Sequence, residues 1–454
     1  MNPKRILAGV VLAAAAGLAA HVGGLSDPIA STIAITVLTA FWWVSEALPI
    51  PATSLVPFAL FPLAGVLDQH QAADALGSYV IILLMGSFML SKALERSGAH
   101  ERLALYMINL VGGSGRRLVI GFMLASALLS MWISNTATTL MLATMALAIL
   151  SRTDDPKLGP ALLLGIAYAS SFGGTATLIG TPPNLIFAEN FLLATGEEFS
   201  FVRWMTIGVP IVVIGLPLMA IWITRSLGGV KTPALADPGP WRKDERRTLM
   251  VFAVAIALWI TRTEPFGGWS GALGMAGAGD STVAIFAVIL MFLIPNGKGG
   301  ALLDWKTAVD IPWGMLLLFA GGICIASGFR ASGLDALIGG QLGGLANAPV
   351  FFMMVGVCLT VTFLTEITSN TATANLLMPL LAAVAAGAGI KPELFMIPAV
   401  ISCSCAFMLP VATAPNAIIY GTGRVSIAQM AREGSILNVI IAIVVASVCW
   451  AMLR

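Results

Sequence analysis

The sequence predicts an all-α polytopic membrane protein with about eleven transmembrane helices plus two re-entrant helical hairpins, arranged as two inverted-topology repeats. This prediction rests on the composition, on the lengths of the apolar runs, and on one polar motif that occurs twice. Of the 454 residues, 58% are hydrophobic and 10% are charged, and the mean hydropathy is +0.93. Such a chain has too little polar surface for a water-soluble globule. The net charge of +2 indicates no polyanionic partner such as a nucleic acid.

Apolar runs long enough to cross the roughly 30 Å hydrocarbon core of a bilayer recur along the chain. The eleven runs predicted to cross are 6–24, 29–47, 51–66, 77–95, 160–193, 206–226, 248–262, 281–296, 312–330, 392–423 and 434–453. The first run follows the basic start "MNPKR", as it would in a secretory signal peptide, but we expect it to be an uncleaved helix. We therefore expect a multi-pass protein of the cell inner (plasma) membrane.

The distribution of basic residues predicts the orientation of these helices. If the N-terminus is cytoplasmic and each run crosses in turn, Arg203, Arg262, Arg330, Lys391 and Arg454 lie outside, and the other 19 of the 24 Lys and Arg residues lie inside. An excess of Lys and Arg in cytoplasmic loops is the usual rule for multi-pass membrane proteins. We therefore place the N-terminus in the cytoplasm and the C-terminus outside.

Two further apolar stretches, 117–150 and 350–386, are predicted not to cross. Basic residues on both sides of 117–150 share the cytoplasmic side only if this stretch enters and leaves by the same membrane face. Its thirty-odd helical residues would span on the order of 50 Å, too long for one crossing and suitable for two half-depth legs. The duplicated polar motif lies within these stretches, as "SNTATTLML" from Ser134 and "SNTATANLL" from Ser369. It marks the tips of two re-entrant hairpins.

The repetition extends beyond the hairpins. "LLMGSFMLSKALERSG" from Leu83 echoes "LLFAGGICIASGFRASG" from Leu317, and "GTPPNLIFAE" from Gly180 echoes "ATAPNAIIYG" from Ala412. An odd number of crossings, five, separates the hairpins and inverts the second copy. Inverted repeats with broken helices are typical of secondary transporters, whose sites lie near the membrane midplane where the repeats meet. We divide the chain into an N-terminal transmembrane helix (1–28), a first repeat (29–230), a cytoplasmic linker (231–247) and a second repeat (248–454).

Glycine and proline residues interrupt the runs 160–193 and 392–423, which we therefore predict to be broken helices. With the two hairpin tips they provide four places where helix ends leave carbonyl and N–H groups free. Carbonyl, hydroxyl and amide oxygens suit a small cation, and helix N-termini suit an anion. No Lys, Arg or His occurs in 128–140, 173–188, 365–378 or 406–420. An anion bound there would therefore need a co-bound cation to balance its charge.

Close helix packing is the alternative explanation for the polar residues, because Ser, Thr and Gly often have this role in membrane proteins. We favour a functional role because the S-N-T-A-T motif is duplicated and each copy is followed by a P-N break. Glu366, beside the second tip, is an equally good candidate for a functional residue and for a neutral structural acid. The five cysteines lack metal-ligand spacing and are predicted to be buried small apolar residues.

At these motifs the sequence resembles the divalent anion/sodium symporter family, the INDY-like sodium-coupled dicarboxylate transporters, over essentially the whole chain. The resemblance implies an elevator-type transporter that forms a homodimer, is not an enzyme and has no organic cofactor. The segments before each hairpin would form the scaffold and the dimer interface, and the hairpins and broken helices would move. The implied partners are a small dianionic carboxylate, co-transported Na+ and the lipid bilayer.

The resemblance also implies which residues bind these partners. The substrate carboxylates would contact Asn135, Thr136, Asn370 and Thr371. One sodium site would comprise Ser130, Ser134, Asn135 and the Gly180 backbone, and the other would comprise Thr365, Thr368, Asn370 and the Ala412 backbone. Ala414 stands at the substrate-facing position where many relatives have proline, so one prolyl ring is lost and the preferred substrate is left open.

We therefore expect a sodium-coupled secondary active transporter that imports small dicarboxylates such as succinate, malate or fumarate. Sulfate or citrate symport and sodium-independent dicarboxylate exchange are alternatives for the same architecture. A channel could also use re-entrant hairpins, but a passive pore cannot accumulate its substrate. An intramembrane enzyme is a weaker alternative, because the sequence has no zinc motif, nucleotide loop or convincing Ser/His pair.

Overall fold

The computed structural model describes residues 3–112, 115–153, 155–228, 239–264, 266–275, 277–342 and 349–454. Within these ranges the regular secondary structure is helical, apart from one isolated antiparallel bridge between Pro295 and Ala301. The all-α prediction is therefore confirmed. The first part of the predicted linker, residues 231–238, lies outside the described residues.

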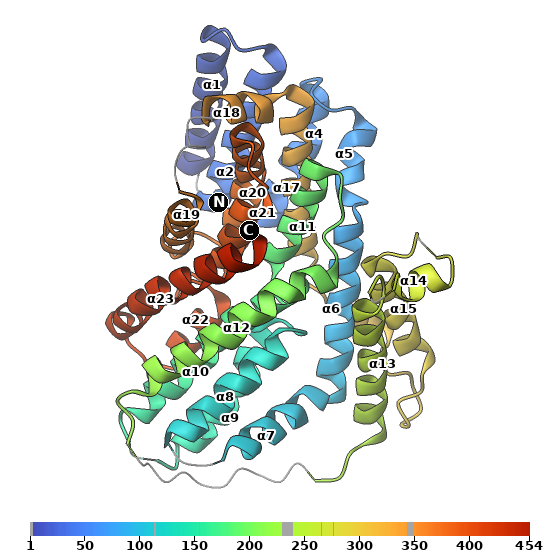
Figure 1. Ribbon diagram of the computed structural model, residues 1–454, viewed down its shortest axis with the longest axis vertical. Helices are drawn as coiled ribbons and strands as arrows, with labels where there is room; N and C mark the ends of the chain where they lie inside the picture. Colours follow the sequence, from blue (N-terminus) through green and yellow to red (C-terminus); the bar gives the residue numbers. More distant parts are fainter. Residues whose placement is uncertain are drawn as a thin grey trace.

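The helices before the linker follow the predicted order of apolar runs (Figure 1). They are α1 (Pro3–Val22), α2 (Asp27–Ser45), α3 (Ile50–Thr53), α4 (Val56–Leu63), α5 (Gln69–Leu76), α6 (Tyr79–Ser97), α7 (Ala99–Val111), α8 (Gly115–Ser130), α9 (Asn135–Leu150), α10 (Leu158–Gly173), the 3-10 helix η1 (Gly174–Ala176), α11 (Pro182–Thr195) and α12 (Phe201–Thr224).

The helices after the linker follow a similar order. They are α13 (Lys243–Ile260), α14 (Gly268–Ala272), α15 (Asp280–Leu293), α16 (Trp305–Ala308), α17 (Trp313–Ser332), α18 (Leu334–Leu342), α19 (Val350–Thr365), α20 (Asn370–Ala388), α21 (Glu393–Cys403), α22 (Ala414–Gly421) and α23 (Ile427–Leu453). Both halves therefore contain a helix–turn–helix pair, α8–α9 or α19–α20, followed by an interrupted helix, α10–α11 or α21–α22.

Serine side chains fix the start of several long helices. At the first turn of α6, Ser78 Oγ accepts the Val80 N–H at 3.2 Å. At the first turn of α23, Ser426 Oγ accepts the Gln429 N–H at 3.2 Å. Each bond satisfies a backbone donor that has no partner within its helix, so the apolar run that follows can enter lipid with fewer exposed polar groups.

Several elements differ from the predicted apolar runs: α5, α14, α16 and α18 lie outside them, and the run 51–66 is divided between α3 and α4. Two further differences have a clear local cause. α7 is a separate helix that the apolar runs do not predict; it follows α6 after Gly98, whose left-handed backbone (φ 73°) turns the chain. α13 begins at Lys243, inside the range predicted to be linker. The Glu245 side chain accepts the Arg242 backbone N–H at 2.8 Å, which fixes the first turn of that helix.

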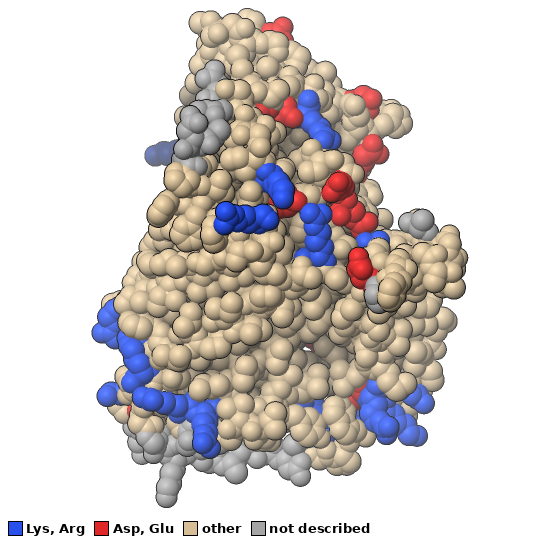
Figure 2. Space-filling model, viewed as in Figure 1, with Lys and Arg blue, Asp and Glu red and all other residues tan. Residues whose placement is uncertain are grey.

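Seven helices in the described part of the chain are long and apolar enough to cross a membrane by length and composition. Several shorter apolar helices accompany them, including α9, α15 and α19. The visible face carries a broad band of uncharged residues, with Lys and Arg gathered at its lower end (Figure 2). These features show a multi-pass membrane protein.

The helices pack as two groups around one continuous apolar core. In one group, α10 packs against α8, α9 and α22, and α23 packs against α12, α19 and α21. In the other group, α17 packs against α2, α4 and α5, and α6 packs against α15. The groups meet where α17 and α18 contact α20 and where α11 contacts α17.

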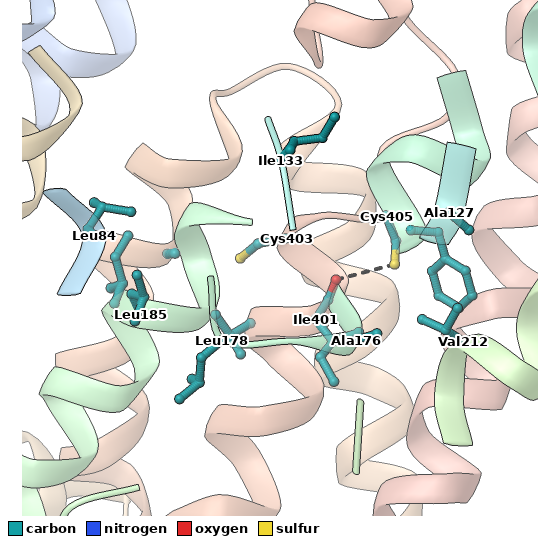
Figure 3. Close-up of a cluster of buried hydrophobic side chains, with 14 of the residues drawn as sticks. Leu84, Ala127, Ile133, Ala176, Leu178, Leu185, Val212, Ile401, Cys403 and Cys405 are labelled. Carbon is teal, nitrogen blue, oxygen red and sulfur yellow. Dashed lines mark hydrogen bonds between the residues drawn. The ribbon is translucent and has the colours of Figure 1, made fainter. Parts of the chain in front are cut away.

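A cluster of buried apolar side chains lies between the broken helices. Ala176 and Leu178, from the first interruption, belong to the same buried cluster as Ile401 and Cys403 of α21 (Figure 3). All five cysteines are buried and free, and Cys405 Sγ donates a hydrogen bond to the Ile401 carbonyl at 3.2 Å. The prediction that the cysteines are small apolar core residues is therefore confirmed.

Candidate functional site

The two S-N-T motifs form tight turns between helices of similar construction. α8 ends at Ser130 and α9 begins at Asn135; α19 ends at Thr365 and α20 begins at Asn370. In the first turn Ser130 Oγ donates to Asn135 Oδ1. In the second turn Thr365 Oγ1 donates to Asn370 Oδ1 at 2.8 Å. Each asparagine side chain is therefore folded back toward the end of the preceding helix and is held there by a hydroxyl.

The two P-N motifs restart the interrupted helices. α11 begins at Pro182 and α22 begins at Ala414, each after an extended threonine. Proline suits the first turn of a helix because its missing N–H has no partner there anyway. The non-helical segments 177–181 and 404–413 separate each restart from the preceding helix.

The asparagine of each P-N motif donates hydrogen bonds to two backbone carbonyls before it, with the same spacing in both motifs. Asn184 Nδ2 donates to the carbonyls of Thr177 at 2.7 Å and Gly174 at 3.3 Å. In the same way, Asn416 Nδ2 donates to the carbonyls of Leu409 and Ala406, both at 3.0 Å. In both motifs the two acceptors lie 7 and 10 residues before the asparagine. Both asparagines are fully buried. These side chains replace helical hydrogen bonds that the interruptions remove.

A first cluster of oxygen atoms lies between the first turn and the first interruption. Ser130 Oγ is 3.2 Å from Ser170 Oγ, which donates to the Asn135 carbonyl at 3.0 Å. A Cβ atom added to Gly174 would lie 2.9 Å from Asn135 Oδ1 and 2.8 Å from the Gly180 carbonyl oxygen. The structure therefore brings together three residues predicted for one cation site: Ser130, Asn135 and Gly180.

A second cluster lies between the second turn and the second interruption. Thr365 Oγ1 is within hydrogen-bond distance of Asn370 Oδ1 and of the Cys403 carbonyl, at 2.8 and 3.0 Å. Thr368 Oγ1, in the turn, lies 2.6 Å from Thr373 Oγ1, near the start of α20. A hydroxyl has one proton to donate, so the Thr365 hydroxyl cannot satisfy both acceptors at once. Excess acceptor oxygens are the environment that a small hard cation prefers.

The turns and interruptions meet at one cavity of about 710 Å³. Its lining includes Ser134, Asn135 and Thr136 from the first turn, Ser369, Asn370 and Thr371 from the second, and residues 180–183 and 412–415 from the interruptions. The same cavity is lined by the three interruption residues that the resemblance assigns to the binding sites: Gly180, Ala412 and Ala414.

Four helix N-termini open onto this cavity, because the first residues of α9, α11, α20 and α22 all line it. The dipole at a helix N-terminus favours an anion. Free N–H groups are expected mainly at α9 and α20, because Pro182, Pro183 and Pro415 have none at the start of α11 and α22. Among the described residues that line the cavity, Lys92 is the only basic one. It lies at the edge with Glu95 and Asp310, and its Nζ is 3.3 and 3.2 Å from their carboxylates. The interior must therefore compensate an anion without a basic side chain.

Some residues of these clusters are not predicted by the sequence motifs. Ser170 and Gly174 lie upstream of the P-N motif, and only their contacts with the first turn place them beside Asn135. The run "YASSFGG" offers a signal, because adjacent serines and glycines in a buried apolar helix are a polar interruption in their own right. The cluster Lys92, Glu95 and Asp310 depends on a contact between distant segments, and no local pattern predicts it.

The comparisons with known proteins agree with this arrangement. The family model of the citrate transporters (CitMHS) matches residues 40–396. The chain is 40% identical to a sodium-dependent dicarboxylate transporter, SdcS, of Staphylococcus saprophyticus, over 94% of this chain and 86% of the relative. It is 38% identical to the SdcS protein of Staphylococcus aureus, over 91% of this chain and 84% of that relative. The resemblance inferred from the motifs is confirmed.

A solved structure shares the fold. The YdaH transporter of Alcanivorax borkumensis superimposes with a TM-score of 0.60 over 84% of this chain and 87% of that one, at 15% sequence identity. That identity supports a common fold and nothing narrower. The extent of the family match and of the sequence identity nevertheless settles the broader class: this chain is a transporter and belongs to the citrate transporter family.

Proposed function

We propose that this protein is a sodium-coupled secondary active transporter that imports small dicarboxylates such as succinate, malate and fumarate. The observation that carries the proposal is the cavity onto which four helix N-termini open, with an oxygen cluster beside each turn. The relatives named sodium-dependent dicarboxylate transporters support both the substrate class and the ion.

The substrate would lie between the two turns. Asn135 and Asn370 are half-buried at the cavity wall, and Thr136 and Thr371 follow them at the start of α9 and α20. Each turn thus presents an amide, a hydroxyl and backbone N–H groups to one carboxylate. Two equivalent anion-binding ends on one cavity suit a molecule with a carboxylate at each end.

Sodium would occupy the two oxygen clusters. Asn135 and Asn370 each face both the cavity and a cluster, so one side chain can contact an anion and a cation together. Such contact couples the two ligands because each reduces the cost of burying the charge of the other. Ser134, whose side chain is exposed in the cavity, and Thr368, whose hydroxyl bonds Thr373, would complete their sites as the resemblance implies.

The moving part would be the group that contains the turns and interruptions, as expected for an elevator in a homodimer. The matching hydrogen-bond spacings of Asn184 and Asn416 support two repeats of one unit. In Figure 1 the pair α8–α9 lies toward the lower end of the molecule, and α20 lies above it. With the N-terminus in the cytoplasm of a plasma membrane, the edge formed by Lys92 and Asp310 faces inward.

Ala414 makes citrate the second candidate substrate. Its side chain is exposed in the cavity at the position where the resemblance expects proline. The smaller methyl group leaves space for a bulkier anion than a four-carbon dicarboxylate, and the matching family model is that of citrate transporters.

The proposal is tested by uptake of labelled succinate into proteoliposomes, with an inward sodium gradient or with choline in its place. We expect sodium-driven accumulation above the external concentration, with competition by malate and fumarate. Equilibration without accumulation would indicate a channel, and uptake that needs only an internal counter-anion would indicate an exchanger. Stronger competition by citrate or sulfate than by malate would change the substrate assignment.

Sodium and dicarboxylate are expected to strengthen the binding of each other by the same factor. Linkage requires this reciprocity, which is typically worth about 1–3 kcal/mol. Isothermal titration of succinate at several sodium concentrations, and of sodium with and without succinate, measures it. Ser130→Ala and Thr365→Ala should each weaken the dependence of succinate binding on sodium, with a smaller effect on which anions compete with succinate. Succinate affinity that is equal in sodium and in choline would contradict the coupling.

Topology provides an independent prediction. A cysteine at Thr153 should react with an impermeant maleimide from the cytoplasmic side, and a cysteine at Lys391 should react from the outside. The five native cysteines are buried, so the wild-type protein provides a low-background control. Reaction of both positions from the same side would exclude the inverted arrangement.

A further inference from the structure

Glu366 is a buried carboxylate next in sequence to Thr365 of the second oxygen cluster, and in the part of the chain that the structure describes its side-chain hydrogen bonds all come from N–H donors. It directly follows Thr365, at the C-terminal end of α19, and is 3% exposed. Oε1 accepts the backbone N–H groups of Phe407 and Met408, at 2.7 and 2.8 Å. Oε2 accepts the Leu409 N–H at 3.0 Å. These three consecutive N–H groups belong to the second interruption, so the carboxylate joins that interruption to the second turn.

A fourth donor comes from another helix. Asn438 Nδ2, on α23, donates to Glu366 Oε1 at 2.8 Å. Three of the four bonds go to Oε1 and one goes to Oε2, and every donor is an N–H group, the kind of partner that favours the ionised carboxylate. Among the ion pairs formed within the described ranges, none includes Glu366. The four donors orient and solvate the carboxylate, but they leave its negative charge without a cationic partner.

The first turn has no counterpart to this charge. Ser130 and Thr365 occupy the same position in the two turns, five residues before Asn135 and Asn370. The residue that follows Ser130 is Met131. Met131 uses its backbone carbonyl to accept the Thr177 hydroxyl at 2.6 Å, which joins the first turn to the first interruption without a charged group. The two clusters therefore share their hydroxyl and amide geometry and differ in one buried carboxylate.

We propose that Glu366 makes the two cation sites unequal in affinity. Its carboxylate strengthens sodium binding at the second cluster, so that this cluster fills before the first as the sodium concentration rises. The carboxylate also positions the second interruption for the bound sodium ion. The inference rests on the proposed function, because it assumes that both clusters bind sodium. A buried negative charge next to neutral oxygen ligands strengthens cation binding because little solvent screens it. A bound sodium ion in turn provides the nearby positive charge that the Glu366 carboxylate does not receive from a side chain. Glu366 acts here as a positioning residue that touches neither the substrate nor the ion.

Sodium binding to the purified full-length protein, measured with ²²Na+ in the absence of dicarboxylate, tests this inference. The wild-type protein should show two classes of site. Glu366→Gln keeps the size of the side chain and removes its charge, so it should weaken the tighter class by tenfold or more and leave the weaker class unchanged. Thr365→Ala should affect the same class as Glu366→Gln, and Ser130→Ala should affect the other. Glu366→Asp restores the charge and should recover part of the affinity.

Asn438→Ala is the second variant, because it removes one donor and leaves the carboxylate in place. It should shift the tighter class in the same direction as Glu366→Gln, by a smaller factor. If Glu366→Gln does not yield folded protein by size-exclusion chromatography, the inference is tested by sodium binding to Glu366→Asp and Asn438→Ala. A wild-type protein with one class of site, or variants in which both classes change together or neither changes, would overturn the inference. Sodium-dependent succinate uptake by the wild-type protein is measured in parallel, so failure of the proposed function is recognised separately.

Discussion

Asn135→Ala and Asn370→Ala should each reduce succinate uptake at least tenfold while leaving the protein folded. Each asparagine lines the cavity, and its Oδ1 atom is bound by the hydroxyl of an oxygen cluster. Loss of a hydrogen bond to a charged group costs about 1.5–3 kcal/mol. Because each side chain is proposed to contact both ligands, its removal should weaken sodium and succinate binding together.

The measurement is initial succinate uptake in proteoliposomes, with sodium and substrate titrated separately. Asn190→Ala is the matched control. Asn190 is also a buried asparagine, but its amide donates within its own helix, to the Ile186 carbonyl at 2.8 Å, and it does not line the site cavity. This control should retain most of its uptake. Wild-type affinity for both ligands in Asn135→Ala or Asn370→Ala would support the helix-packing explanation of the motif instead.

Gly174→Ala should strongly weaken the sodium dependence of uptake. A Cβ atom at Gly174 would lie 2.8 Å from the Gly180 carbonyl oxygen and 2.9 Å from Asn135 Oδ1. Contacts this short force either the first interruption or the first turn to move, and both supply oxygen atoms to the first cluster. A displacement of a few tenths of an ångström changes the geometry on which cation coordination depends. We expect the sodium concentration for half-maximal uptake to rise tenfold or more.

Gly159→Ala, in the helix α10 that precedes Gly174, provides the matched control. A Cβ atom there would meet Leu150 side-chain atoms at 3.8 Å, an ordinary van der Waals contact, and alanine favours the helix more than glycine does. Uptake by Gly159→Ala should therefore equal that of the wild type, with unchanged or slightly higher thermal stability. Normal sodium dependence in Gly174→Ala would show that the first cluster does not bind the coupled ion.

The sequence predicts the helical fold because its signals are local. An apolar run of the right length forms a helix in lipid, where each backbone group must be bonded within its own segment. The helix–turn–helix pairs and the interruptions also follow from local chemistry, since Pro182 and Pro415 restart helices and the turn motifs begin them. The boundaries of α7 and α13 are less predictable, because a left-handed glycine and one glutamate side chain decide them.

The site is only partly determined by the sequence alone. The duplicated motifs identify Asn135, Asn370 and the two interruptions, because repetition of a polar pattern in apolar sequence is visible without coordinates. The contacts of Ser170 with the first turn and of Glu366 with the second interruption join segments about 40 residues apart, and no local pattern encodes them. Only the tertiary structure decides that Glu366 receives four N–H donors and, among the described residues, forms no ion pair. The physical reason is that burial and hydrogen-bond partners are set by helix packing, whereas apolar length and proline or glycine content, which are local, indicate most helices and their interruptions.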